Sequence, residues 1–297
     1  MAGGEGRVCD IRYHTAVIID GHTHIFPPDV GERRDEYLRR DAGFREIYSR
    51  PEARIATADE LLASMDGAGI DASVACGFGW SDAELCRSHS EYLLEVASAS
   101  GGRIIPFCTI QPADGDARDD LKRYAVRGAR GLGELRPAQQ GYSLIDSPEA
   151  NLLAWAADAY DLAVLFHASE PVGHVYPGKT GLPVNQLGRF VSDFPGVAVI
   201  AAHWGGGLPF YALMPEMRSA LDRTYFDTAA TGFLYSPEIY ARVIDLVGAE
   251  KIIFGSDFPL IPQERALKEL RDVPLDEAAR RLIEGENIRD LLRLPAP

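Results

Sequence analysis

The sequence predicts an α/β fold, a single (β/α)8 barrel that takes in residues 1–297. Eight short apolar segments alternate with helical segments, and their hydrophobicity is continuous, as in parallel strands covered on both faces. A length of 297 residues with 46% hydrophobic content suits eight βα units. A doubly wound open sheet is the alternative, but the turn after the first strand, Gly21-His22-Thr23-His24, lacks the GxGxxG phosphate motif.

The expected strands and helices are marked by apolar runs and by capping residues. Thr57 and Glu60 have capping-box spacing before a helix that Gly69 ends, and Ser147-Pro148 places an N-cap before a first-turn proline. The expected strands are 17–24, 72–78, 104–110, 129–135, 162–167, 197–203, 224–227 and 251–256. The expected helices are 57–68, 81–100, 114–126, 147–160, 184–194, 208–221, one from 236, and a last one opening at Glu286-Asn287.

Two segments fall outside this alternation. Residues 1–16 are Gly-rich and polar, which predicts a loose arm or a minor extra strand. Residues 25–56 are expected as a long loop after the first strand. The charge-dense run from Glu32 to Asp41 within that loop is typical of a solvated helix, and a lid over the preceding residues is the alternative.

Charge and cysteine content narrow the class of protein. The net charge of −14 repels nucleic acid and anionic membranes, so we expect a small-molecule substrate and no nucleic-acid or membrane partner; a homodimer is compatible with this. The chain lacks both an apolar run of about eighteen residues and the apolar core of a signal peptide, which predicts a cytoplasmic protein. The four cysteines show no CxxC spacing and are predicted to be reduced.

The first strand ends in Asp20-Gly21-His22-Thr23-His24. Side chains alternate along a strand with a period of two, so Asp20, His22 and His24 are expected on one face. Two imidazoles on one face can reach the same metal ion. Taken alone, the pair is equally compatible with histidines that are hydrogen-bonded in a core.

Other strands end in residues of the same kind. Glu134 ends the fourth expected strand, His167 the fifth and His203 the sixth, and Asp257 follows the eighth. In a parallel barrel the carboxyl ends of the strands carry the chemistry. Each residue by itself could be a hydrogen-bonded core histidine or a helix-capping carboxylate, but their convergence on one rim predicts a metal site.

These residues lie in motifs that resemble the amidohydrolase superfamily, specifically the amidohydrolase-2 branch that includes aminocarboxymuconate-semialdehyde decarboxylase. The motifs are Asp20-Gly-His22-Thr-His24, Phe166-His167, His203-Trp-Gly-Gly-Gly-Leu-Pro-Phe210, Tyr225-Phe-Asp227, Phe254-Gly-Ser-Asp257-Phe-Pro259 and Gly285-Glu-Asn-Ile-Arg289. The resemblance implies a divalent metal, zinc first and manganese second, and no organic cofactor. It also implies that His22, His24, His167 and Asp257 are metal ligands and that His203 and Asp257 are catalytic.

The fourth strand departs from the pattern of many two-metal relatives, because it has no lysine for a carbamate bridge. Glu134 stands there instead, as in the TatD-like nuclease branch, where a glutamate helps to hold a second metal. The alternative is an ion pair between Glu134 and Arg136, which share a strand face. A TatD-like nuclease is less favoured, because it requires a basic approach surface.

The segment 170–179 is the main candidate for substrate contact. It leaves the barrel at the metal-bearing rim, where loops govern substrate choice, and a solvated loop is the alternative. Trp80 and Trp204, just past strand ends, are predicted to form apolar pocket walls. The full set of expected substrate-binding residues is Glu170, His174, Tyr176, Lys179, Arg136, Trp80 and Trp204.

We therefore expect a metal-dependent hydrolase that cleaves a C–N or C–O bond of a small carboxylated or cyclic metabolite through a metal-activated water. The alternative is a non-oxidative, metal-dependent decarboxylase of the same branch. A TatD-like nuclease and a non-catalytic binding protein are the remaining hypotheses.

Overall fold

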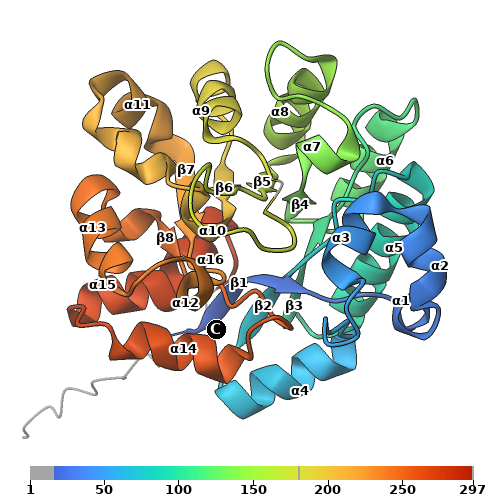
Figure 1. Ribbon diagram of the computed structural model, residues 1–297, viewed down its shortest axis with the longest axis horizontal. Helices are drawn as coiled ribbons and strands as arrows, with labels where there is room; N and C mark the ends of the chain where they lie inside the picture. Colours follow the sequence, from blue (N-terminus) through green and yellow to red (C-terminus); the bar gives the residue numbers. More distant parts are fainter. Residues whose placement is uncertain (1–16, 180, 296–297) are drawn as a thin grey trace, which may run out of the picture.

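Eight parallel strands form a nearly closed barrel in the computed structural model, which describes residues 17–179 and 181–295 (Figure 1). The strands pair in chain order from β1 to β8. They are β1 (Ile19–His24), β2 (Ala72–Cys76), β3 (Ile104–Cys108), β4 (Gly131–Leu135), β5 (Ala163–Phe166), β6 (Val199–Ala201), β7 (Thr224–Asp227) and β8 (Ile252–Ile253). This arrangement confirms the predicted (β/α)8 barrel.

The barrel closes between its last and first strands. β8 is only two residues long, but the chain beyond it runs along β1, where the Asp257 amide donates to the His22 carbonyl at 2.9 Å. The Asp20 carboxylate lies across the same junction and accepts a hydrogen bond from the Ser256 hydroxyl at 2.5 Å. We call this β8–β1 junction the seam.

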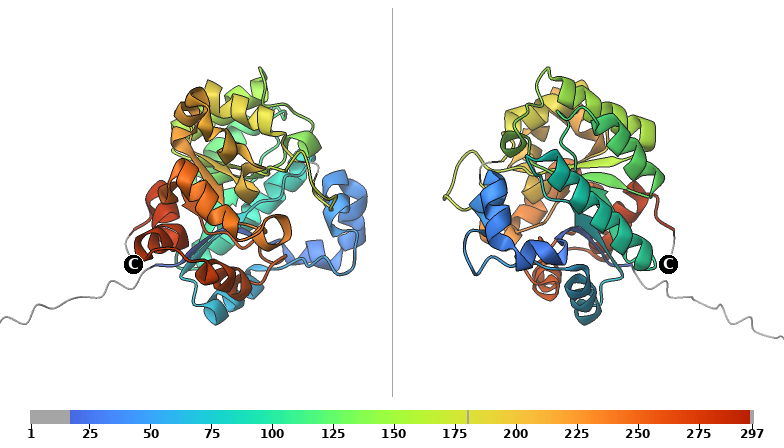
Figure 2. Two further views of the ribbon diagram at one scale, coloured as in Figure 1. Left: turned by 60° about the vertical axis from the view of Figure 1, so that its left-hand side comes forward. Right: turned by 90° about the vertical axis from the view of Figure 1, so that its right-hand side faces the viewer.

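Helices surround the sheet and cover its outer face (Figures 1 and 2). The longer ones alternate with the strands, as a βα repeat requires. The helices are α1 (Pro28–Glu32), α2 (Arg34–Arg40), α3 (Ala42–Tyr48), α4 (Ala58–Ala68), α5 (Ala83–Ala99), α6 (Ala117–Val126), α7 (Pro137–Gln140), α8 (Pro148–Tyr160), α9 (Val184–Asp193), α10 (Ala202–Gly205), α11 (Pro215–Ala220), α12 (Thr231–Leu234), α13 (Glu238–Val247), α14 (Gln263–Asp272), α15 (Glu277–Arg281) and α16 (Asn287–Leu291). Four short helical segments complete the set: η1 (Leu208–Leu213), η2 (Leu221–Arg223), η3 (Ala249–Lys251) and η4 (Leu282–Glu286).

The expected long loop at 25–56 contains the three helices α1, α2 and α3. The charge-dense run lies mainly in α2, in agreement with a solvated helix. Phe44 and Tyr48, one helical turn apart in α3, stack with ring centroids 4.6 Å apart and pack against Phe26 and Phe78. This aromatic cluster explains why the segment is ordered as helices, because it gives them a small apolar core of their own.

Two helix predictions differ from the structure in detail. The segment 208–221 is not one helix but η1 and α11, because Pro215 cannot continue the hydrogen-bonding pattern and instead begins α11. The last helix does not open freshly at Glu286-Asn287, since η4 already carries the chain in helical conformation into α16.

Some sequence predictions concern residues outside those that the structure describes. The expected arm at 1–16 and Cys9 belong to this group. Cys76, Cys86 and Cys108 are buried and free. Within residues 17–179 and 181–295, no helix combines the length and the apolar character that crossing a membrane requires.

Candidate metal centre

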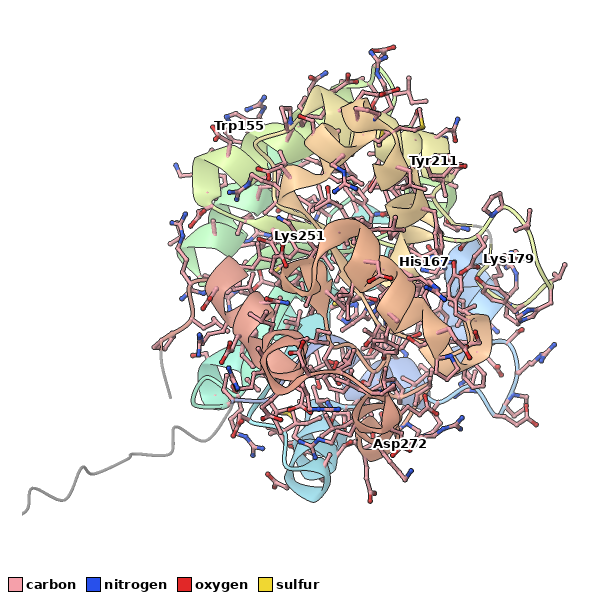
Figure 3. The ribbon with its side chains drawn as sticks, turned by 90° about the vertical axis from the view of Figure 1, so that its left-hand side faces the viewer. Trp155, His167, Lys179, Tyr211, Lys251 and Asp272 are labelled. Atoms are coloured by element: carbon pink, nitrogen blue, oxygen red, sulfur yellow. The ribbon has the colours of Figure 1, made fainter. Side chains whose placement is uncertain are left out.

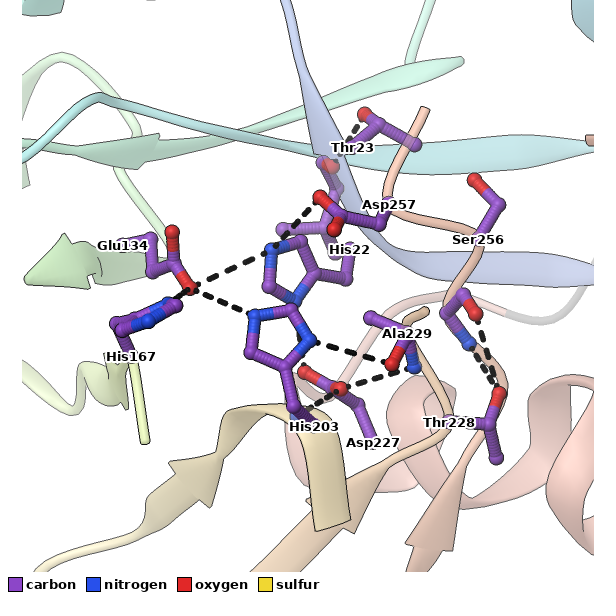
Figure 4. Close-up of polar contacts among 12 residues, drawn as sticks. His22, Thr23, Glu134, His167, His203, Asp227, Thr228, Ala229, Ser256 and Asp257 are labelled. Atoms are coloured by element: carbon purple, nitrogen blue, oxygen red, sulfur yellow. Dashed lines mark hydrogen bonds and ion pairs between the residues drawn. The ribbon is translucent and has the colours of Figure 1, made fainter. Parts of the chain in front are cut away.

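The polar residues at the strand ends converge at the carboxyl-terminal rim of the barrel (Figure 4). Their side chains are almost completely buried, with Asp257 the most accessible at 13%. Parallel strands bring their carboxyl ends to the same rim, so residues far apart in the sequence meet there. The residues concerned are His22, His24, Glu134, His167, His203, Asp227 and Asp257.

His22, His24 and Asp257 form one group that could hold a metal ion. The Nε2 atoms of the two histidines are 3.0 Å apart, and Asp257 Oδ1 lies 3.8 Å from the first and 3.5 Å from the second. His22 Nδ1 donates to Asp227 Oδ2 at 2.8 Å, so its neutral tautomer leaves the Nε2 lone pair facing the group.

His24 is also placed as a candidate metal ligand. Its Nδ1 is buried and has no hydrogen-bond partner among the described residues, so hydrogen bonding at that atom does not orient the ring. Its Nε2 instead faces His22 Nε2 and, at 3.6 Å, Glu134 Oε2. The donor set of two imidazoles and a carboxylate is one that zinc and manganese both accept.

Glu134 is the centre of a second group, with His22 and His203. Its Oε1 lies 3.8 Å from His22 Nε2, 3.3 Å from His203 Nε2 and 2.8 Å from His167 Nδ1. The structure therefore places His167 against Glu134, outside both three-residue groups. No ion pair joins Glu134 and Arg136 among the described residues, so this alternative is wrong: the Glu134 carboxylate is taken up by the histidines instead.

The carboxylates change how the histidines titrate. Burial opposes the charged form of His22, but the charges of Asp227 and Glu134 outweigh it and raise the pKa of His22 to about 10. Burial likewise opposes the charged form of His203, yet the contact with Glu134 and the charge of Asp257 raise its pKa to about 9. The rim thus concentrates negative charge that a divalent cation would neutralise.

The pKa values of His24, His167 and Glu134 are shifted in the opposite direction and are all lowered. Burial prevails at His24 and His167 and lowers the pKa of both. Burial would raise the pKa of Glu134, but the charges of His167 and its neighbours hold that pKa well below its usual range. Glu134 is therefore a carboxylate that can accept protons or coordinate a cation.

His203 is held in an unusual backbone conformation, with φ 56° and ψ 51°. Asp227 fixes it there, because Oδ1 accepts from the His203 amide at 2.8 Å while Oδ2 accepts from His22. His203 Nδ1 donates to the Ala229 carbonyl at 3.2 Å, and Nε2 faces Glu134. Both ring nitrogens therefore face acceptors, which favours a ring that carries a proton on each.

The geometry of this rim can be compared with known proteins. The amidohydrolase family profile matches residues 19–294 of the chain. The chain belongs to the amidohydrolase family. The match confirms the resemblance found in the sequence motifs.

Relatives of this amidohydrolase include named decarboxylases. The 6-methylsalicylic acid decarboxylase of Penicillium expansum is 30% identical over 111 residues, a match that spans 31% of this chain and only 33% of that protein. The structure of 5-carboxyvanillate decarboxylase from Sphingomonas paucimobilis superposes with a TM-score of 0.78 at 18% identity, over 95% of this chain and 100% of that one.

A third similar protein is 5-carboxyvanillate decarboxylase from Novosphingobium aromaticivorans, complexed with manganese and 4-hydroxy-3-methoxy-5-nitrobenzoic acid. It superposes with a TM-score of 0.77 at 14% identity, over 95% of this chain and 97% of that one. At these identities the structural likeness shows the shared barrel. The relative matched by sequence is a decarboxylase, which supports the decarboxylase alternative better than the hydrolase placed first from the sequence.

In this amidohydrolase several side chains of the predicted substrate loop, residues 170–179, form hydrogen bonds within the loop. Tyr176 donates to Glu170 Oε2 at 2.8 Å, and Lys179 Nζ donates to the backbone carbonyls of Val172 and His174 at 2.6 and 2.5 Å. Figure 3 shows Lys179 on this loop with His167 beside it on the barrel side. The predicted substrate contacts of Glu170, His174, Tyr176 and Lys179 stay predictions.

One peptide of the loop reaches the metal centre. The Gly178 carbonyl accepts from His167 Nε2 at 2.9 Å and from Arg136 Nη2 at 3.2 Å, and the Gly178 amide donates to Glu46 Oε1 at 3.1 Å. The loop therefore lies beside α3, as both views in Figure 2 show. This contact could not be predicted from the sequence, because it is made by the backbone of a loop glycine, which has no side chain to indicate it.

The two tryptophans are placed in the core. Trp80 is 1% exposed within the aromatic cluster and donates from Nε1 to His89 at 3.1 Å, whereas Trp204 is fully buried and donates to Thr231 at 2.9 Å. Their predicted contact with substrate has no support from this packing. Asp227, in contrast, received no role from the sequence, although its position at the end of β7 follows the same rule as the other rim residues.

Proposed function

We propose that this amidohydrolase is a metal-dependent, non-oxidative decarboxylase of small aromatic carboxylic acids. The observation that carries the proposal is His203, whose two ring nitrogens face the Ala229 carbonyl and Glu134, so that it holds a proton next to the candidate ligands. Decarboxylation of an aromatic acid requires a proton donor at that place. The acids after which the relatives are named, 6-methylsalicylic acid and 5-carboxyvanillate, are substituted benzoic acids and support the substrate class.

In this proposal His22, His24 and Asp257 hold a divalent metal. His167, the fourth ligand predicted from the sequence, would bind the metal only after a ring nitrogen leaves Glu134 or the Gly178 carbonyl. Manganese is the proposed ion, because a relative with the same barrel is complexed with it, and zinc is the alternative. A bound metal would hold the substrate oxygens and withdraw electron density from the carboxylate to be lost. Asp227 fixes the tautomer of His22 through Nδ1.

The protein residues would then transfer one proton to the substrate. His203 gives its Nε2 proton to the ring carbon that bears the carboxylate. The bond between that carbon and the carboxylate breaks, its electron pair restores the aromatic ring, and carbon dioxide leaves. Glu134, 3.3 Å from His203 Nε2, is placed to stabilise the protonated imidazole before transfer and to assist its return afterwards.

The test uses the manganese-loaded protein with 2-hydroxy-6-methylbenzoate, 2,6-dihydroxybenzoate and 5-carboxyvanillate in deuterium oxide. We expect stoichiometric carbon dioxide and a product that carries one solvent deuterium at the vacated carbon. His203→Asn should reduce turnover by about a hundredfold or more while it retains metal. Full turnover in that variant would contradict the assigned role of His203.

A hydrolase is the second candidate, because Glu134, His22 and His203 form another potential ligand group that could activate water. The same assay in oxygen-18 water separates the two. A hydrolase incorporates the label from the attacking water into its product, whereas a decarboxylase leaves the product unlabelled apart from exchange into carbon dioxide.

A further inference from the structure

Arg136 follows β4 by one residue and is completely buried. Its Nη2 donates to the Gly178 carbonyl at 3.2 Å, but its Nε and Nη1 are enclosed and have no hydrogen-bond partner. These two atoms carry three of the five N–H bonds of the guanidinium. Burying such donors without an acceptor is costly, so the native environment is expected to supply one.

No carboxylate of the described residues supplies the missing acceptor. None has an oxygen within 4.0 Å of a guanidinium nitrogen of Arg136. Glu134, the strongest of the charges acting on it, is taken up by His167 at 2.8 Å. Burial lowers the pKa of Arg136, against the effect of Glu134 and Glu46, which is the direction expected of a cation that lacks a close counter-ion.

The guanidinium borders the candidate metal centre. Arg136 Nη2 and His167 Nε2 share one acceptor, the Gly178 carbonyl, and His167 in turn contacts Glu134. The Phe78 ring lies 5.7 Å from the guanidinium carbon and presents an apolar surface to it. A ligand held at the centre would therefore extend toward a buried cation and an aromatic ring.

Tyr48, at the end of α3, adds a polar group at the same place. Its ring packs against Phe78 at 6.0 Å, and no hydrogen bond of its hydroxyl is found among the described residues. Burial raises the pKa of Tyr48, and the charges of Asp257 and Glu134 raise it further. The charge of Arg136 acts to lower it. Tyr48 and the Arg136 guanidinium thus both pack against the Phe78 ring.

We propose that Arg136, with Tyr48 beside it, forms an anion subsite for a second carboxylate of the substrate. This rests on the proposed function, in which the first carboxylate is held at the metal centre. The substrate class is then narrowed to aromatic dicarboxylic acids. Arginine suits this task, because its planar donors bind a carboxylate at two points.

The test measures binding rather than turnover. The manganese-loaded protein is titrated calorimetrically with benzoate, benzene-1,3-dicarboxylate and benzene-1,4-dicarboxylate. We expect at least one dicarboxylate to bind about tenfold or more tightly than benzoate, since charge-assisted hydrogen bonds in a buried site are strong. In Arg136→Met that preference should disappear, while the affinity for benzoate changes less than about threefold.

The matched control is Arg130→Met, an exposed arginine just before the opposite end of the same strand, which should keep the full preference. If Arg136→Met does not fold, a structure of the wild-type protein with the tighter dicarboxylate decides the question. A carboxylate within hydrogen-bond distance of Arg136 Nε or Nη1 supports the subsite, and ordered water alone at those atoms overturns it.

The outcomes also separate this proposal from the proposed function. A dicarboxylate preference that depends on Arg136, without release of carbon dioxide from any acid tried, supports the subsite and contradicts the decarboxylase. Decarboxylation with an unchanged preference in Arg136→Met overturns the subsite and leaves the reaction standing.

Discussion

Replacing Asp227 by asparagine isolates the contact that orients both His22 and His203. In the native protein one carboxylate oxygen accepts from His22 Nδ1 at 2.8 Å, and the other accepts from the backbone amides of His203 and Ala229 at 2.8 and 3.1 Å. Asparagine has one acceptor oxygen and one donor group. Two backbone amides outweigh one ring nitrogen, so we expect the oxygen to stay with them and the NH2 group to face His22.

The consequence is a change of tautomer in His22. Its Nδ1 would have to accept from the amide, so its proton would move to Nε2, the atom that faces His24 and Asp257. A protonated Nε2 cannot bind a metal. Changing such an outer partner of a ligand typically lowers metal affinity about 10-fold to 100-fold, or about 1.4 to 2.7 kcal/mol.

Manganese affinity of Asp227→Asn is measured by competition with a chromophoric chelator, beside the wild type and Asp222→Asn. Asp222 is exposed at the opposite end of β7, so the same chemical change there should leave metal affinity untouched. Thermal unfolding of the metal-free variants controls for loss of structure. An affinity equal to the wild type in Asp227→Asn would refute the tautomer argument.

Three further predictions address the ligands, the loop and the scaffold. Removing metal with a chelator should abolish turnover until manganese is restored, and His24→Ala should fail to regain metal, as measured by elemental analysis; normal metal content in that variant would exclude His24 as a ligand. Gly178→Ala should raise KM, because the Gly178 carbonyl accepts from His167 and Arg136, and should lower Tm by only a few degrees, because φ of +89° strains a side chain there by about 1 kcal/mol; an unchanged KM in steady-state kinetics would contradict this. Ser147→Ala should lose about 1 kcal/mol of unfolding free energy in denaturant titrations without affecting activity, since Ser147 Oγ caps α8 through the Ala150 amide at 3.0 Å; unchanged stability would show that the cap contributes nothing.

The sequence predicted the barrel and the rim well because both depend on local periodicity. Continuous apolar runs between helix caps specify parallel strands, and the alternation of Asp20, His22 and His24 follows from strand geometry alone. Residues at strand ends then meet because the topology brings them together. No knowledge of side-chain contacts was needed to place Glu134 and Asp257 at the same rim as the histidines.

The remaining features depend on tertiary contacts that a sequence does not display. Tyr48 lies more than eighty residues before Glu134, and only the packing of α3 brings it near the centre. Trp80 follows a strand end, as a pocket residue would, but the aromatic cluster draws it into the core. The sequence could not decide the reaction class for a related reason: hydrolysis and decarboxylation use the same candidate ligands, and the protonation of His203 depends on neighbours supplied by other strands.

The position of the candidate ligands at the seam couples metal binding to the integrity of the fold. His22 and His24 belong to the first strand, whereas Asp257 follows the last, and the nearby Asp20–Ser256 contact spans 236 residues of sequence. An ion bound by all three would act as a reversible cross-link that closes almost the whole chain into a ring, which removes conformational freedom from the opened state. The metal would thus stabilise the pairing of the last strand with the first. In the metal-free protein, backbone amides along this junction should exchange with solvent before those of the other strand pairs.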